Sequence, residues 1–119
     1  MRLLDQFVSL PGGVYPLLLV AALLEVLGDS YFQTAVHRSS GSARWAPAFV
    51  GAAILSLYGL VVNLPGWDFG KLLGVYVVFF FLAAQAVAWL KFRQPISLPV
   101  CVGGILIAAG GLVIRFWQR

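Results

Sequence analysis

The sequence contains four long runs of apolar residues that are separated by short polar connections. The runs cover residues 14–36, 45–64, 72–90 and 96–114. Each has about the 20 residues that an α-helix needs to cross the hydrocarbon core of a bilayer. We therefore expect one transmembrane domain over residues 1–119, all-α, with four membrane-spanning helices. The residues before the first run, 1–13, are expected to form an interfacial tail.

The composition agrees with this assignment and argues against a soluble fold. Hydrophobic residues make up 61% of the chain and charged residues 10%, whereas a soluble domain has about 25% charged residues. The spans and their connections leave no room for a separate catalytic or nucleotide-binding domain. We expect a multi-pass protein of a bacterial or archaeal inner (plasma) membrane, without enzymatic activity and without a cofactor.

The basic residues lie at the ends of the predicted spans and divide evenly between the two sides of the membrane. One side has Arg2, Lys71, Arg115 and Arg119, and the other has Arg38, Arg44, Lys91 and Arg93. At these positions they face lipid headgroups, so the net charge of +4 predicts contact with the bilayer and not with nucleic acid.

Lys/Arg asymmetry sets the orientation of a membrane protein, so an even split predicts insertion in both orientations. Two inverted copies would form an antiparallel, dual-topology homodimer. Such a dimer supplies the inverted repeat that larger transporters carry within one chain. The alternative is that the true span boundaries shift a charge or two, so that one orientation wins.

Two acidic residues lie inside the first run. Glu25 is roughly 15 Å along the helix from Tyr15, near the bilayer centre, and Asp29 follows one turn later on the same face. A carboxylate at that depth costs about 2.5–3.5 kcal/mol on insertion scales and is usually functional. We expect Glu25 to face a cavity. For Asp29, a structural hydrogen bond to a neighbouring helix is an open alternative.

A carboxyl group in an apolar site can bind a proton, and a cation can take the place of that proton. This mutual exclusion is the minimum requirement for proton/cation antiport. The small side chains of Ala21 and Gly28 share the face of Glu25 and leave space beside it. No Lys or Arg lies inside a predicted span, which disfavours anionic substrates. Two carboxylates without a nearby imidazole or thiolate make a poor transition-metal site, so we expect no metal.

Aromatic residues in the second and third runs are candidates for recognising an organic cation. Tyr76 offers a π face or a hydroxyl group, and Phe80 lies one turn further along. Tyr58 is a further polar residue that could line the site. Packing in the protein core is the alternative role for each of them.

The fourth run carries two glycine pairs, Gly103-Gly104 and Gly110-Gly111. Their seven-residue spacing places both pairs on one stripe of the helix. Small residues let membrane helices approach closely, so this run is expected to serve in assembly of the protein. Packing within one chain is the alternative.

Two stretches of the sequence resemble the small multidrug resistance family, the four-helix, proton-coupled efflux proteins of the drug/metabolite transporter superfamily. They are AALLEVLGDS, residues 21–30, and ISLPVCVGGILIAAGGLVI, residues 96–114. The stretch GKLLGVY, residues 70–76, is also similar to an allied family of small uncharacterised inner-membrane proteins of the same fold.

The resemblance implies an antiparallel homodimer in which both copies of Glu25 bind protons and substrate competitively. By position, it implies a site lined by Ala21, Gly28, Asp29 and Tyr76, and a dimer interface formed by Gly103 and Gly110.

The sequence thus predicts a proton-coupled exporter of small organic cations that works by alternating access. Asp29 stands where the family has a small polar residue, and Leu73 where it has a pocket tyrosine. The extra carboxylate favours a small, polar or doubly charged cation. The alternative functions are a non-transporting four-helix membrane subunit and one half of a heteromeric transporter or flippase.

Overall fold

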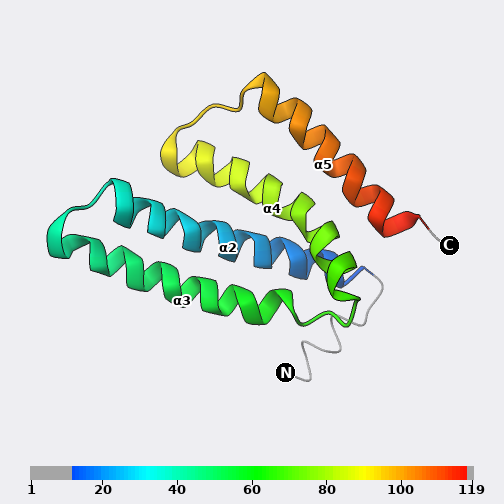
Figure 1. Cartoon of the computed structure of the whole chain (residues 1–119), viewed down its shortest axis with the longest axis horizontal. Coiled ribbons are helices and arrows are strands. Elements are labelled where there is room, and N and C mark those ends of the chain that lie inside the picture. The colour runs from blue at the N-terminus through cyan, green and yellow to red at the C-terminus, as the bar shows by residue number, and fades with distance from the viewer. Residues whose placement is uncertain (1–11, 118–119) are drawn as a thin grey trace.

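The computed structural model describes residues 12–117, which form four long α-helices and one short 3-10 helix (Figure 1). In chain order these are α2 (Val14–His37), η1 (Gly41–Arg44), α3 (Trp45–Val62), α4 (Phe69–Phe92) and α5 (Leu98–Phe116). All four long helices are apolar and long enough to cross a membrane. The prediction of an all-α, multi-pass membrane protein is therefore confirmed. Most of the predicted interfacial tail lies outside the described residues.

The helix ends differ from the predicted bounds by up to three residues. The largest difference is in α4, which includes Lys71 and Lys91 near its two ends. Long basic side chains extend along a helix and place their charge at the membrane surface, so a helix can continue past its apolar run. The expectation that no basic residue lies inside a span is therefore wrong at the helix ends, where α5 also includes Arg115.

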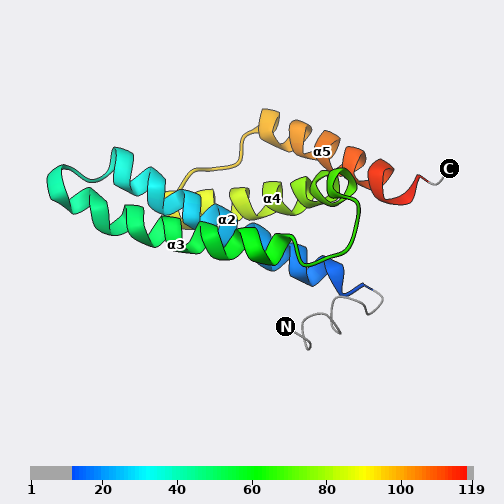
Figure 2. The same cartoon turned by 60° about the horizontal axis from the view of Figure 1, so that its bottom comes forward.

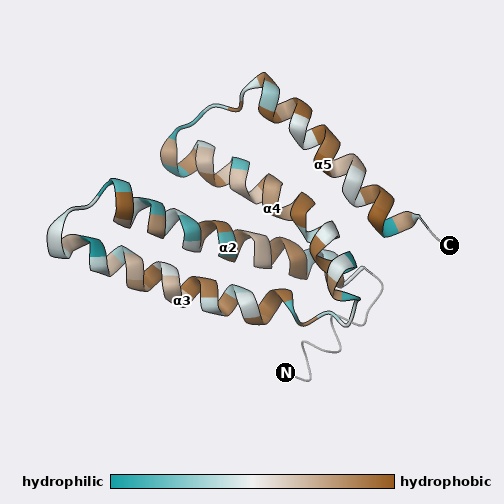
Figure 3. Cartoon of the chain, in the orientation of Figure 1, coloured by the Kyte–Doolittle hydropathy of each residue, from teal (hydrophilic) through white to brown (hydrophobic). Residues whose placement is uncertain are grey.

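The helices lie side by side in the order α3, α2, α4, α5 (Figure 1). In the view of Figure 2, α2 and α3 overlap, and α5 lies on the other side of α4. The chain measures 53 × 40 × 20 Å, so this arrangement is wide and thin. The central helix α2 packs against both α3 and α4, and α4 packs in addition against α5. As a result α3 and α5 expose most of their apolar side chains, which suits helices surrounded by lipid. Both helices consist mostly of hydrophobic residues (Figure 3).

The core lies where α3 and α4 converge on the first half of α2. Leu18 and Ala21 of α2 have no exposed surface, and Val62 of α3 and Leu72 of α4 are each 2% exposed. Asp29 lies on α2 beyond Leu18 and Ala21, towards the C-terminal end of the helix, and its side chain is exposed. The face that carries Glu25 therefore changes from covered to open along its length.

α2 and α3 approach each other closely at two glycines, Gly28 and Gly51. A Cβ atom on Gly51 would lie 2.8 Å from the carbonyl oxygen of Gly28 and 2.9 Å from Cδ2 of Phe32. The carbonyl oxygen belongs to the backbone, so it can move away only if the two helices separate. Glycine is thus required here for close helix packing, as it is in many membrane helix pairs.

Replacing Gly51 with alanine is expected to destabilise the protein by about 1–3 kcal/mol, because the added methyl group overpacks the contact between α2 and α3. Gly59 is the matched control, since it lies on the same helix and a Cβ there would meet nothing within 4 Å. Gly59→Ala should leave stability unchanged or raise it by up to ~1 kcal/mol. Unfolding of the purified variants in mixed micelles, followed by circular dichroism, measures both changes. Equal stability of the two variants would contradict the packing described.

Candidate functional site

The site is built around a hydrogen bond between the two central helices. The hydroxyl group of Tyr76 on α4 donates to Oε1 of Glu25 on α2, over 2.7 Å. Tyr76 is only 4% exposed, and Glu25 is half-buried. A hydrogen bond in the low-dielectric interior of a protein is electrostatically stronger than one in water. This contact therefore holds α2 and α4 together at the depth that the sequence predicts for the bilayer centre.

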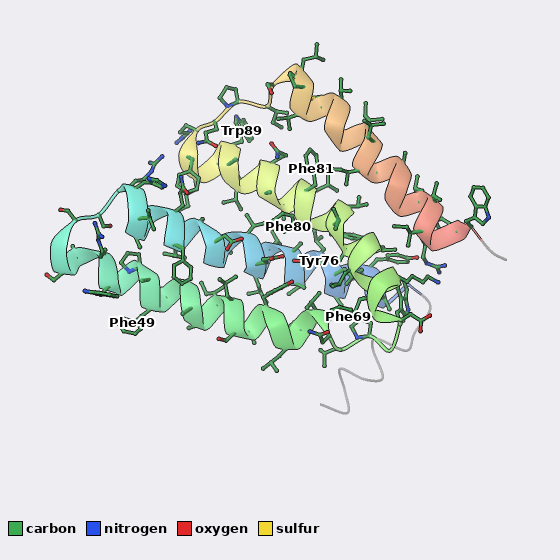
Figure 4. All side chains as sticks on the ribbon, in the orientation of Figure 1. Phe49, Phe69, Tyr76, Phe80, Phe81 and Trp89 are labelled. Atoms are coloured by element: carbon green, nitrogen blue, oxygen red, sulfur yellow. The ribbon has the colours of Figure 1, made fainter. Side chains whose placement is uncertain are left out.

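Glu25 opens into a pocket of about 250 Å³ that three helices form. The other lining residues are Tyr58 of α3 and Leu73, Tyr76, Val77 and Phe80 of α4. The ring centroids of Tyr58 and Tyr76 are 5.8 Å apart, and those of Tyr76 and Phe80 are 6.3 Å apart. Tyr76 and Phe80 lie one turn apart on α4 (Figure 4). One carboxyl group thus faces an aromatic wall. None of these six lining residues is basic, so the pocket has the character of a cation site.

The structure brings together four of the residues that the sequence singled out, namely Glu25, Tyr58, Tyr76 and Phe80. Two others lie elsewhere. Ala21 is fully buried in the core, and Gly28 faces α3, where a Cβ atom would be 2.7 Å from Cγ of Leu55. Both were expected to line the pocket because they share one broad face of the helix with Glu25. Contact with a neighbouring helix covers those positions.

Asp29 lines a second pocket, on the side of α2 that faces the end of α4. The remaining lining residues are Val26, Ser30, Gln33, Val87, Ala88, Phe92 and Gln94. This pocket is more polar than the first, and Asp29 is exposed where Glu25 is half-buried. The two carboxyl groups are one helical turn apart, yet they open into different spaces. Their roles can therefore be separated by substitution.

Lys91 contacts a residue that lines the Asp29 pocket, Ser30, and the sequence did not single it out. Its Nζ atom donates to Oγ of Ser30 over 2.9 Å and lies 4.1 Å from the ring centroid of Tyr31. This contact depends on the extension of α4 beyond its apolar run. Two sequence features could have suggested this contact: a serine near the end of the first apolar run and a long basic side chain just after the third. Val77, which lines the Glu25 pocket, was missed because its apolar side chain carries no signal of a site.

The glycines of α5 divide into two sets with different surroundings. A Cβ atom on Gly104 would lie 2.5 Å from the ring of Phe81, and one on Gly111 would overlap Cγ2 of Val78. Both of these glycines therefore serve packing against α4. On Gly103 and Gly110, a Cβ atom would meet nothing within 4 Å. This second set leaves a face of α5 free for close approach of another helix.

Within residues 12–117, no group of three or more His, Cys, Asp or Glu side chains is placed to hold a metal ion. Comparison of the chain with models of protein families, with characterised proteins and with solved structures finds no match. The two pockets and the residues that line them are therefore the features that indicate a function.

The pocket at Glu25 is expected to contain water, and cysteine labelling tests this. In a Cys101→Ser background, which removes the native thiol, Leu73→Cys should react with a charged, membrane-impermeant thiosulfonate because Leu73 lines the pocket. The neighbouring Leu72→Cys is the matched control and should stay unlabelled, since Leu72 is 2% exposed. A pocket filled by lipid would leave both cysteines unreacted and would contradict the expectation.

Proposed function

We propose that this chain is a proton-coupled exporter of small organic cations, of the small multidrug resistance type, in a bacterial or archaeal plasma membrane. The observation that carries the proposal is the Glu25 carboxyl group, half-buried in an apolar span and hydrogen-bonded to Tyr76 at the wall of an aromatic pocket. An ionisable residue inside a membrane span is costly and therefore indicates a pathway for ions or substrate.

The pocket supports a competition between a proton and a cation. When Glu25 is ionised, the Tyr76 hydroxyl group stabilises its charge, and a cation can approach the carboxylate. The rings of Tyr58 and Phe80 then offer π faces to that cation. When Glu25 is protonated, the attraction is lost. Cation affinity should accordingly fall as pH falls.

An antiparallel homodimer is the assembly that this site favours. The four basic residues on each side predict no fixed orientation, and α5 offers an open face at Gly103 and Gly110. Inverted pairing would bring two copies of Glu25 towards the middle of the membrane. Rocking of the two subunits against each other would then expose the shared site to each side in turn.

Glu25→Gln should abolish exchange, because an amide neither releases a proton nor attracts a cation. Proteoliposomes loaded at pH 6 with a fluorescent pH indicator and diluted to pH 8 report proton efflux when guanidinium, tetramethylammonium or ethidium is added outside. With the wild-type protein, at least one of these cations should raise the internal pH. With Glu25→Gln, the signal should fall to that of protein-free vesicles.

Asp29→Asn is the matched control. It also replaces a carboxyl group with an amide, but at a residue that lies one helical turn from Glu25 and lines a different pocket. It should retain exchange. Unchanged exchange in Glu25→Gln would contradict the mechanism. Loss of exchange in Asp29→Asn, with exchange retained in Glu25→Gln, would indicate that exchange takes place at the second pocket.

Dual topology can be tested apart from transport. Two fusions are made after Arg119, one to a reporter that is active only in the cytoplasm and one to a reporter that is active only outside it. With dual topology, both fusions should show activity. Adding three lysines to the connection between α2 and α3 should bias insertion to one orientation and reduce function, which a second chain of opposite bias would restore. A single orientation in the unmodified chain would contradict the homodimer and favour a heteromeric complex.

A further inference from the structure

The end of the molecule where α2 begins and α5 ends carries a cluster of cations and aromatic rings. The guanidinium carbon of Arg115 lies 5.3 Å from the ring centroid of Trp67, and Nζ of Lys71 lies 5.2 Å from that same ring. Arg115 also lies 5.0 Å from the ring of Phe116, and its Nε donates to the hydroxyl group of Tyr15. Tryptophan and tyrosine favour the level of the lipid headgroups. The cluster thus holds two positive charges at that level.

An apolar groove runs from this cluster into the membrane-spanning part of the chain. It has a volume of about 240 Å³. Its lining residues come chiefly from α4 and α5 and are Tyr15, Val75, Val78, Phe79, Ala108, Gly111, Leu112, Arg115 and Phe116. From Arg115 to Ala108 the groove follows α5 for roughly 10 Å, at 1.5 Å per residue. Of these residues, none lines the pocket of Glu25.

The groove is apolar and lies within the membrane-spanning part of the chain, whereas the cluster at its end is cationic and lies at the membrane surface. Together they match a ligand with an apolar chain and an anionic headgroup. We infer that the groove binds an acyl chain of an anionic phospholipid, with the lipid phosphate against Arg115 and Lys71. Basic pockets between membrane helices bind such headgroups. This inference does not depend on the transport function.

The geometry of Arg115 suits a phosphate ligand. A guanidinium group has five N–H donors, and the bond to Tyr15 uses Nε. The two terminal nitrogens carry the other donors, which can engage phosphate oxygens in pairs. The guanidinium carbon also lies 5.9 Å from the ring centroid of Tyr15, 5.3 Å from that of Trp67 and 5.0 Å from that of Phe116. Lys71 adds a second charge on Trp67, and the loop before it contributes a single acidic residue, Asp68.

Native mass spectrometry of the purified protein measures lipid binding directly. The protein is mixed with phosphatidylglycerol or with phosphatidylcholine of identical acyl chains, and the fraction carrying lipid is counted. We expect phosphatidylglycerol to bind several-fold better. Lys71→Gln should lower its affinity roughly fivefold, as expected for one basic residue at a membrane surface. Ala108→Leu, which fills the groove, should lower the affinity for both lipids.

Arg44→Gln is the matched control, because it removes one positive charge at the opposite end of the molecule; it should leave phosphatidylglycerol binding unchanged. Lys71 is exposed, so its variant should fold, which circular dichroism checks. Equal binding of the two lipids, or equal losses in Lys71→Gln and Arg44→Gln, would overturn the proposal. A dimer that binds no lipid would also overturn it, since the groove would then be filled by the second copy.

Discussion

A carboxyl group inside a membrane needs a partner supplied by the protein, because hydrocarbon offers none. Glu25 meets this requirement through the hydroxyl group of Tyr76. The arrangement of the central helices follows from that contact, since α4 must cross α2 closely enough for the bond to form. Ala21 and Ala22 of α2 are fully buried and belong to the same core as Tyr76 of α4, and small side chains such as these let membrane helices approach closely. The bond that satisfies the acid also positions the aromatic wall of its pocket.

The thin arrangement of the helices determines how the pocket can be completed. The two inner helices, α2 and α4, each pack against two neighbouring helices, while the outer helices α3 and α5 present apolar side chains outward. A pocket between helices that is open on one side can be closed by lipid or by a second copy of the chain. The open glycine face of α5 and the even distribution of basic residues favour an inverted copy for part of this surface. The groove at Arg115 favours lipid for another part.

The sequence predicted the four helices well, because apolar runs of this length have few other structures available. It also predicted that Glu25 and Tyr76 belong to one site, although they are 51 residues apart. It placed Asp29 and Gly28 in that site too, since helical periodicity defines a face but not which neighbour covers it. Tertiary packing decides which neighbour covers each side of α2. Gly28 faces α3, and Asp29 lines another pocket. The reach of Lys91 was missed because a flexible side chain leaves no periodic signal.

The central claim is that a proton and a cation compete for Glu25. Calorimetric titration of the purified protein with a transported cation, repeated in buffers of different ionisation enthalpy, counts the protons released on binding. The account predicts proton release at pH values where the free carboxyl group is partly protonated, decreasing as pH rises, and no release in Glu25→Gln. Cation binding without proton release at every pH, or release that persists in Glu25→Gln, would contradict it.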